Sequence, residues 1–116
     1  MFIYQRSNEM SRKLLDEVYC ELEQFGIVDT RAEYCTQWLG RSECYLRTLR
    51  FLKQNPSIDV LAVLNNRLNY YAEHYSEQDG RASRLATRRL SKLADKCTIA
   101  IESRSEKVWM KRLREA

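Results

Sequence analysis

Four basic side chains stand close together in one short segment of the chain, and they are Arg41, Arg47, Arg50 and Lys53. The only acidic residue between them is Glu43. An arginine guanidinium can donate two hydrogen bonds side by side to O6 and N7 of guanine, and both arginine and lysine hold phosphates. The cluster therefore favours a polyanionic ligand, and double-stranded DNA in particular. For each arginine taken alone, a solvated surface position is the alternative.

Side chains for catalysis or metal binding are sparse. His74 is the only histidine, and no nucleophile stands near it in the sequence. The chain has no glycine-rich phosphate loop, no paired-carboxylate motif and no Ser-His-Asp signature. The tyrosines near His74 are interpreted as core or interface residues rather than as a stacking platform for single strands. We therefore predict no enzyme activity, no cofactor and no metal site.

The cysteines do not have the spacing of a metal site. No CxxC pair occurs among them, and they are Cys20, Cys35, Cys44 and Cys97. Each lies among apolar residues in a segment with helical spacing. We interpret them as free thiols, mostly buried, as expected in a reducing compartment.

The spacing of apolar residues predicts an all-α fold. Only three glycines and one proline occur in 116 residues, which argues against β-sandwiches and barrels with their many turns. Apolar residues recur every three or four positions, as in helices with one buried face, over 8–25, 31–39, 43–54, 58–74 and 81–114. The expected core is Leu15, Val18, Leu22, Leu39, Leu46, Leu49, Leu61, Leu64 and Leu68.

The second and third of these helices have the pattern of a helix-turn-helix. A glycine, Gly40, lies between them, where a tight turn favours a positive φ. Thr36 is expected at the small position where the two helices cross. Trp38 is expected on the outer side of the first helix, or packed against Leu52 or the C-terminal arm.

At these residues the chain resembles the phage Cro and repressor type of helix-turn-helix regulators. The resemblance covers about residues 10–70, with a leader helix before the motif and a further helix after Pro56-Ser57. It implies a bacterial or phage transcription regulator that binds DNA. The run from Trp38 to Ser42 is also similar to small uncharacterised bacterial proteins.

In such regulators the second helix of the motif enters the major groove, with its N-terminal residues on the base edges. Arg47 is the best candidate for contacting guanine. Glu43 could accept a hydrogen bond from cytosine N4, or it could simply lie favourably at the positive N-terminal end of the helix. Ser42 is explained equally well as the N-cap of this helix and as a base contact. The expected base contacts are Ser42, Glu43, Cys44 and Arg47, with Thr48 and Phe51 further along. The expected phosphate contacts are Arg41, Arg50 and Lys53.

The charge is unevenly distributed along the chain. Residues 1–80 hold 9 basic and 12 acidic side chains, net −3, whereas residues 81–116 hold 11 basic and 4 acidic ones, net +7. We therefore expect a compact four-helix bundle over 1–76, which contains the helix-turn-helix, and a long basic helical arm over 77–116. The arm favours a polyanion partner or an interaction tail, and a solvated helix face is the alternative.

The arm also carries an apolar stripe with near-heptad spacing, which predicts a homodimer. The alternative is that the stripe folds back onto the core of its own chain. The stripe consists of Ala86, Leu90, Leu93, Cys97, Ala100 and Ile101.

Two classes of function are consistent with the sequence. The first is a DNA-binding transcription regulator. The second is a small helical protein-interaction module, an adaptor or inhibitor that keeps the helix-turn-helix only as a scaffold. The longest apolar run is only the five residues 60–64, and the chain starts without a secretory signal, so we expect a cytoplasmic protein with no membrane partner.

Overall fold

Helices make up all of the regular secondary structure in the computed structural model, which describes the backbone of residues 2–115 and the side chains of 11–115. Met1 and Ala116 lie outside this range. They are the first residue of the bundle expected over 1–76 and the last residue of the arm expected over 77–116. The all-α prediction with a long C-terminal helix is confirmed. No described helix combines the length and apolar composition that a bilayer crossing needs. The elements are α1 (Phe2–Gln24), α2 (Arg31–Glu33), η1 (Tyr34–Trp38), α3 (Tyr45–Leu52), α4 (Ile58–Ser76) and α5 (Arg81–Glu115).

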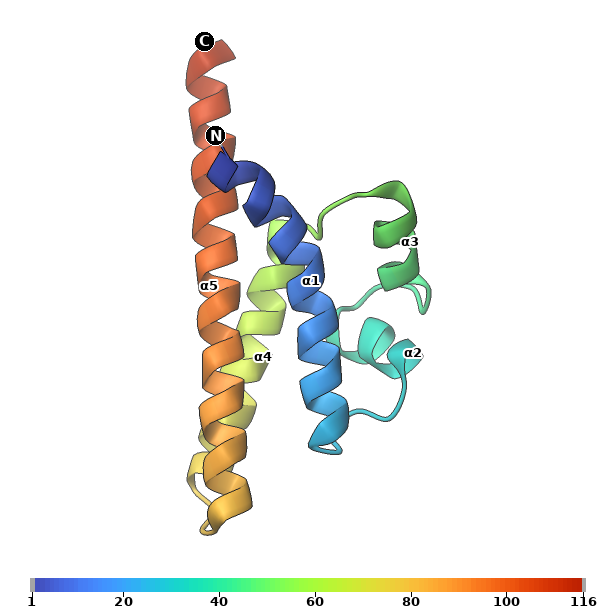
Figure 1. Cartoon of the computed structure of the whole chain (residues 1–116), viewed down its shortest axis with the longest axis vertical. Helices are drawn as coiled ribbons and strands as arrows, with labels where there is room; N and C mark the ends of the chain where they lie inside the picture. The colour runs from blue at the N-terminus through green and yellow to red at the C-terminus, as the bar shows by residue number, and fades with distance from the viewer. Residues whose placement is uncertain (1, 116) are drawn as a thin grey trace.

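The helices pack on either side of α1 (Figure 1). On one side α4 and α5 run antiparallel along each other, and α1 packs along α5. On the other side lie α2, η1 and α3, with α3 packed on α1. The C-terminal end of α5 extends beyond the ends of the other helices (Figure 1), and the molecule measures 53 × 26 × 21 Å. As a result, α1 and α4 separate α5 from α3.

The core forms where α1, α4 and α5 meet, and all nine core residues predicted from the sequence are buried. Burial of apolar surface at about 25 cal/mol per Å² is the main favourable term that holds these helices together. A polar group of Tyr34 enters the core, where its hydroxyl donates a 2.9 Å hydrogen bond to the Leu15 carbonyl oxygen. Burial raises the pKa of Tyr34 well above its ordinary value, so this phenol stays a donor.

The apolar stripe of α5 belongs to the same core. Leu90 and Cys97 are fully buried, Ala86 and Leu93 are almost so, and Ala100 and Ile101 are partly buried. In the structure the stripe therefore folds back onto the core of its own chain, which was the alternative to pairing with a second copy. The side of the arm expected to pair with a second copy is already covered.

The first helix of the expected helix-turn-helix differs from the prediction, because it contains a π-helical turn. The Leu39 amide donates to the carbonyl oxygen of Tyr34, five residues back, at 3.1 Å, so the turn is wider than an α-helical one. The wide turn places Tyr34 and Trp38 on the buried side and leaves Thr36 exposed. Both expectations for this helix were wrong: Thr36 is not at a buried crossing point, and Trp38 is not on the outer side.

Trp38 packs on α4 instead. Its ring centroid lies 5.1 Å from that of Tyr71, and the Arg67 guanidinium lies 4.2 Å above the indole ring. Arg67 also donates a 2.5 Å hydrogen bond to the Gln37 carbonyl oxygen. A cation stacked on tryptophan is worth about 0.5–2 kcal/mol. These contacts fix η1 against α4.

Caps and turns set the remaining boundaries. Thr30 Oγ1 accepts from the Glu33 amide at 3.1 Å, and Ser57 Oγ accepts from the Val60 amide at 3.4 Å, as expected for N-caps. Gly40 has a φ of 65°, which explains a glycine at this turn. The third helix begins at Tyr45 rather than 43, because the Tyr45 amide bonds to the backbone carbonyl of Ser42 and no side chain caps it. The long helix runs through 103–105 without interruption.

The cysteines are free but not all buried. Cys35 and Cys97 lie in the core, Cys44 is half-buried and Cys20 is exposed. Burial raises the pKa of the Cys97 thiol to about 12, which keeps it protonated and unreactive. Among the described residues, no three side chains of the types that bind metals come together.

Candidate nucleic-acid interface

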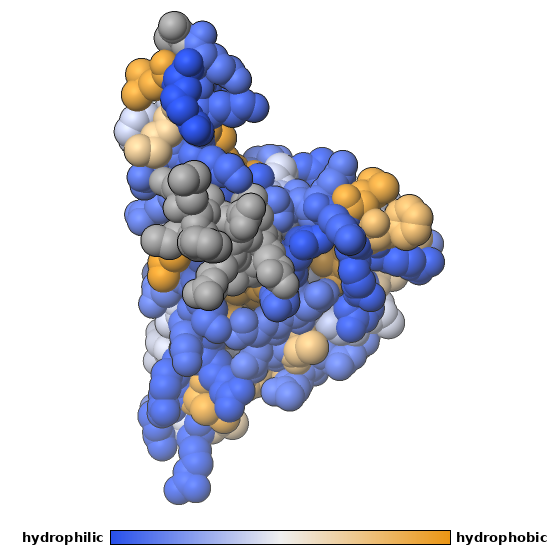
Figure 2. Space-filling model, turned by 45° about the horizontal axis from the view of Figure 1, so that its top comes forward, coloured by the Kyte–Doolittle hydropathy of each residue, from blue (hydrophilic) through white to orange (hydrophobic). Residues whose placement is uncertain are grey.

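Within the part of the chain that the structure describes, no other helix covers the outer face of α3. Leu46 and Leu49 turn inward against α1, whereas Arg47, Thr48 and Phe51 point to solvent. Phe51 is 83% exposed, which is unusual for an aromatic side chain in a helix of a globular domain. Figure 2 shows apolar side chains on the projecting edge of the molecule where α3 lies, with hydrophilic side chains around them. We call Arg47, Thr48 and Phe51 the α3 outer face.

A groove between α1 and α3 runs beside this face. Its floor is apolar, because Leu46 and Leu49 lie there. Asp16 is the only acidic residue among the described side chains that line it, and it faces the Arg31 guanidinium at 3.8 Å. Four cations and one partly neutralised carboxylate make this a site of positive potential, and we call it the basic groove. Its charged rim consists of Arg12, Lys13 and Asp16 from α1 and Arg50 and Lys53 from the α3 end.

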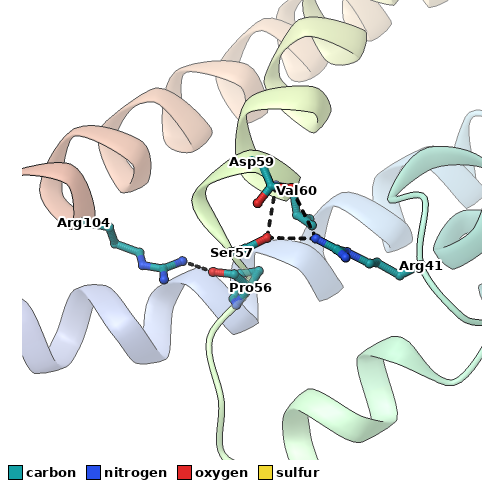
Figure 3. Close-up of polar contacts among 6 residues, drawn as sticks. All are labelled: Arg41, Pro56, Ser57, Asp59, Val60 and Arg104. Atoms are coloured by element: carbon teal, nitrogen blue, oxygen red, sulfur yellow. Dashed lines mark hydrogen bonds and ion pairs between the residues drawn. The ribbon is translucent and has the colours of Figure 1, made fainter. Parts of the chain in front are cut away.

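Arg41 is engaged within the chain. Its Nη2 donates to Ser57 Oγ at 3.2 Å and forms an ion pair with Asp59 Oδ2 at 3.3 Å (Figure 3). The pKa of Asp59 is lowered mainly by a hydrogen bond with the Ser57 side chain, and further by backbone hydrogen bonds and by Arg41. This carboxylate therefore stays charged. Arg41 therefore ties the turn after η1 to the start of α4.

A second arginine holds the connection between α3 and α4 from the other side. The Arg104 guanidinium of α5 donates to the carbonyl oxygen of Pro56, a buried residue (Figure 3). Burial lowers the pKa of Arg104, but an arginine remains charged at neutral pH. Because Arg41 and Arg104 anchor the same short segment, the position of α3 on the body is fixed.

The structure separates the residues predicted to contact DNA into four groups. Arg47 lies on the α3 outer face, and Arg50 and Lys53 line the basic groove. Arg41 contacts α4 as described. The remaining three lie in the turn before α3 rather than on it, Ser42 and Glu43 exposed and Cys44 half-buried.

Two cations of the groove were missed by the sequence analysis. Arg12 and Lys13 are far from α3 in the sequence, and only the packing of α1 against α3 brings them to Arg50 and Lys53. The available signal was a pair of adjacent basic residues in the expected leader helix.

Comparisons with known proteins place no activity on this site. The model of a family of unknown function (DUF6626) matches residues 15–110, most of the chain. No curated protein and no solved structure matches. The matched range contains η1, α3, α4 and most of α5, and it leaves out Arg12 and Lys13.

Proposed function

This chain belongs to the DUF6626 family, whose function is unknown, and we propose from its surface that it binds double-stranded DNA with α3 in the major groove. The observation that carries the proposal is the open α3 outer face beside the basic groove. The major groove is about 12 Å wide and admits one helix, provided that the side chains on one side of that helix are free. A C-terminal helix packed over α3 would have closed this surface, and α5 instead lies beyond α1 and α4 (Figure 1).

The two surfaces take different roles in this proposal. The α3 outer face contacts base edges, with Arg47 donating to guanine O6 and N7 and Phe51 against a thymine methyl group. The basic groove holds phosphates next to the helix, through Arg50, Lys53 and the two cations of α1. Together these contacts describe a sequence-selective DNA-binding protein of the kind that regulates transcription.

A protein-interaction module remains the second candidate, and one observation favours it. Phe51 and its neighbour Leu52, which is 50% exposed, form an apolar pair on a projecting helix. Exposed apolar patches are typical of surfaces that bind proteins. The two candidates differ in the effect of salt, because phosphate contacts weaken steeply with ionic strength and apolar contacts do not.

Arg47→Ala is expected to weaken binding to a preferred duplex by roughly 1–3 kcal/mol, about 5- to 160-fold, because it removes a bidentate donor to guanine. The fold should be unchanged, since Arg47 is exposed and the inward-facing leucines stay in place. The measurement is a fluorescence-anisotropy titration against a duplex selected from a random pool and against a scrambled duplex.

Lys53→Ala is the matched comparison. It should weaken binding to both duplexes equally and lower the slope of log affinity against log salt by about one. If Arg47→Ala behaves in the same way as Lys53→Ala, α3 touches only phosphates and the assignment of Arg47 is wrong. If the wild type binds no duplex at low salt, DNA binding itself is excluded and the protein-interaction candidate takes its place.

A further inference from the structure

The exposed side of α5, which borders α1 at Leu85, Arg88, Lys92 and Ile99, has an ordered arrangement of charge. Residues spaced by three and four along this side are exposed over the whole helix, as a single helical face requires. We call this side the α5 outer face. In chain order it carries Arg81, Arg84, Leu85, Arg88, Lys92, Asp95, Ile99, Glu102, Glu106, Trp109 and Leu113.

The cations of this face differ from those on its flank. Arg89 lies beside α1 and pairs with Glu21 at 3.0 Å, and Lys96 pairs with Glu17 at 2.6 Å. Within the described residues, no ion pair joins Arg84, Arg88 or Lys92 to another side chain of the chain. Arg88 and Lys92 line a hollow together with Glu17 and Glu21 of α1. Those two carboxylates pair with the flank cations Lys96 and Arg89, so the basic residues of the outer face are available to a partner.

The two signs of charge are separated along the face. The first half, from Arg81 to Lys92, is basic, and the next turns carry the carboxylates of Asp95 and Glu102 on either side of Ile99. A face that is basic in one half and acidic in the next is complementary to itself when it is turned around. We propose that the α5 outer face pairs with the same face of a second copy, with the two helices antiparallel.

The charges fix the register of this pair. A two-fold axis that crosses the outer face at the level of residues 93 and 94 along the helix sets Lys92 opposite Asp95 of the second copy. It also sets Leu85, and Arg84 beside it, opposite Glu102, and it sets Arg88 opposite Ile99. Each of these contacts occurs twice, as in any isologous interface. Opposite charges at neighbouring helices are the usual determinants of helix orientation.

Other occupants fit this face less well. A nucleic acid would meet the first half favourably, but its phosphates would be repelled by Asp95 and Glu102. A parallel second copy would set each cation against the same cation. In the antiparallel copy Lys92 meets Asp95 and Arg84 lies beside Glu102, so both of these carboxylates meet a cation of the other copy.

The proposed pairing uses a different side of α5 from the apolar stripe that is buried in the core. It also leaves the α3 outer face untouched, because α1 and α4 lie between α5 and α3 (Figure 1). The two surfaces approach each other at Lys13, which lines the basic groove and also a hollow beside Ile99. The α3 outer face would be open on both copies. Dimerisation and DNA binding can therefore succeed or fail independently.

A charge-exchange experiment tests the pairing by sedimentation equilibrium. One variant carries Arg84→Glu, Arg88→Glu and Lys92→Glu, so its outer face is almost wholly acidic. The other carries Asp95→Lys and Glu102→Lys, so Glu106 is the one carboxylate left on its outer face. The wild type should dimerise at tens of micromolar in low salt, and each variant alone should have a dissociation constant at least a hundredfold higher. An equimolar mixture of the two variants should recover dimers.

Arg112→Glu with Arg114→Glu is the control, because these exposed residues lie on the same helix but off the outer face. It should dimerise as the wild type does. A monomeric wild type at 100 micromolar, or a mixture that stays monomeric, would overturn the proposal. If a variant lost its helical circular dichroism, the milder pair Arg88→Gln with Lys92→Gln would replace it. That pair should weaken dimerisation about tenfold, and an unchanged dimer would also count against the pairing.

Discussion

Replacing Arg50 and Lys53 together with glutamine is expected to weaken duplex binding about two hundredfold at 50 mM salt. Both cations line the basic groove beside the α3 outer face. Each phosphate contact releases about 0.9 of a counterion, which is worth roughly 1.6 kcal/mol at this salt concentration. Two lost contacts therefore remove about 3.2 kcal/mol. The slope of log affinity against log salt should become shallower by about 1.8.

The measurement is an anisotropy titration at 50, 100 and 200 mM salt. Arg112→Gln with Arg114→Gln is the matched control, because it removes the same net charge from an exposed part of α5 that is outside the groove. This control should lose less than threefold in affinity. Equal losses in the two double variants would mean that net charge, rather than the groove, determines binding.

Trp38→Ala is expected to lower the free energy of unfolding by about 3–5 kcal/mol, the range found when a large buried aromatic is removed. Trp38 is only 3% exposed, and it lies between Arg67 and Tyr71 of α4. Its loss leaves a cavity under η1 and frees the Arg67 guanidinium from its stacking partner. Since a small domain is stable by about 5–15 kcal/mol in total, the variant should be close to unfolding at physiological temperature.

Urea denaturation followed by circular dichroism measures this effect. Trp109→Ala is the control, because Trp109 is 49% exposed near the end of α5, and it should change stability by less than about 0.5 kcal/mol. Trp38→Phe keeps an aromatic ring in the site and should recover at least half of the loss. Equal effects of the two alanine variants would show that η1 does not depend on the indole.

The inward-facing residues could be predicted from the sequence because helical periodicity reports burial directly. Leu15, Leu46 and Leu64 stand at three- and four-residue spacing with their neighbours, and each packs as expected. The caps at Thr30 and Ser57 could be predicted for a similar reason, since a capping side chain acts on an amide only two or three residues away.

Features that depend on tertiary packing could not be predicted in the same way. The π turn places one extra residue in a helix, and nothing in the residue types of 34–38 marks it. The groove requires Arg12 to meet Lys53 across two helices. Arg41 has the composition of a phosphate contact, but it lies next to Asp59 only because α4 begins beside the turn. In the candidate site, the sequence therefore indicated the residue types but not all of their positions.

The central claim is that α3 and the basic groove form the surface that meets DNA. Its most direct test is a backbone amide NMR titration of the uniformly ¹⁵N-labelled chain with a short duplex at low salt. We expect the largest shift changes at Arg47, Thr48, Arg50, Phe51 and Lys53, with smaller ones at Arg12 and Lys13. The account is contradicted if the spectrum does not change, or if the changes are confined to α4 and α5.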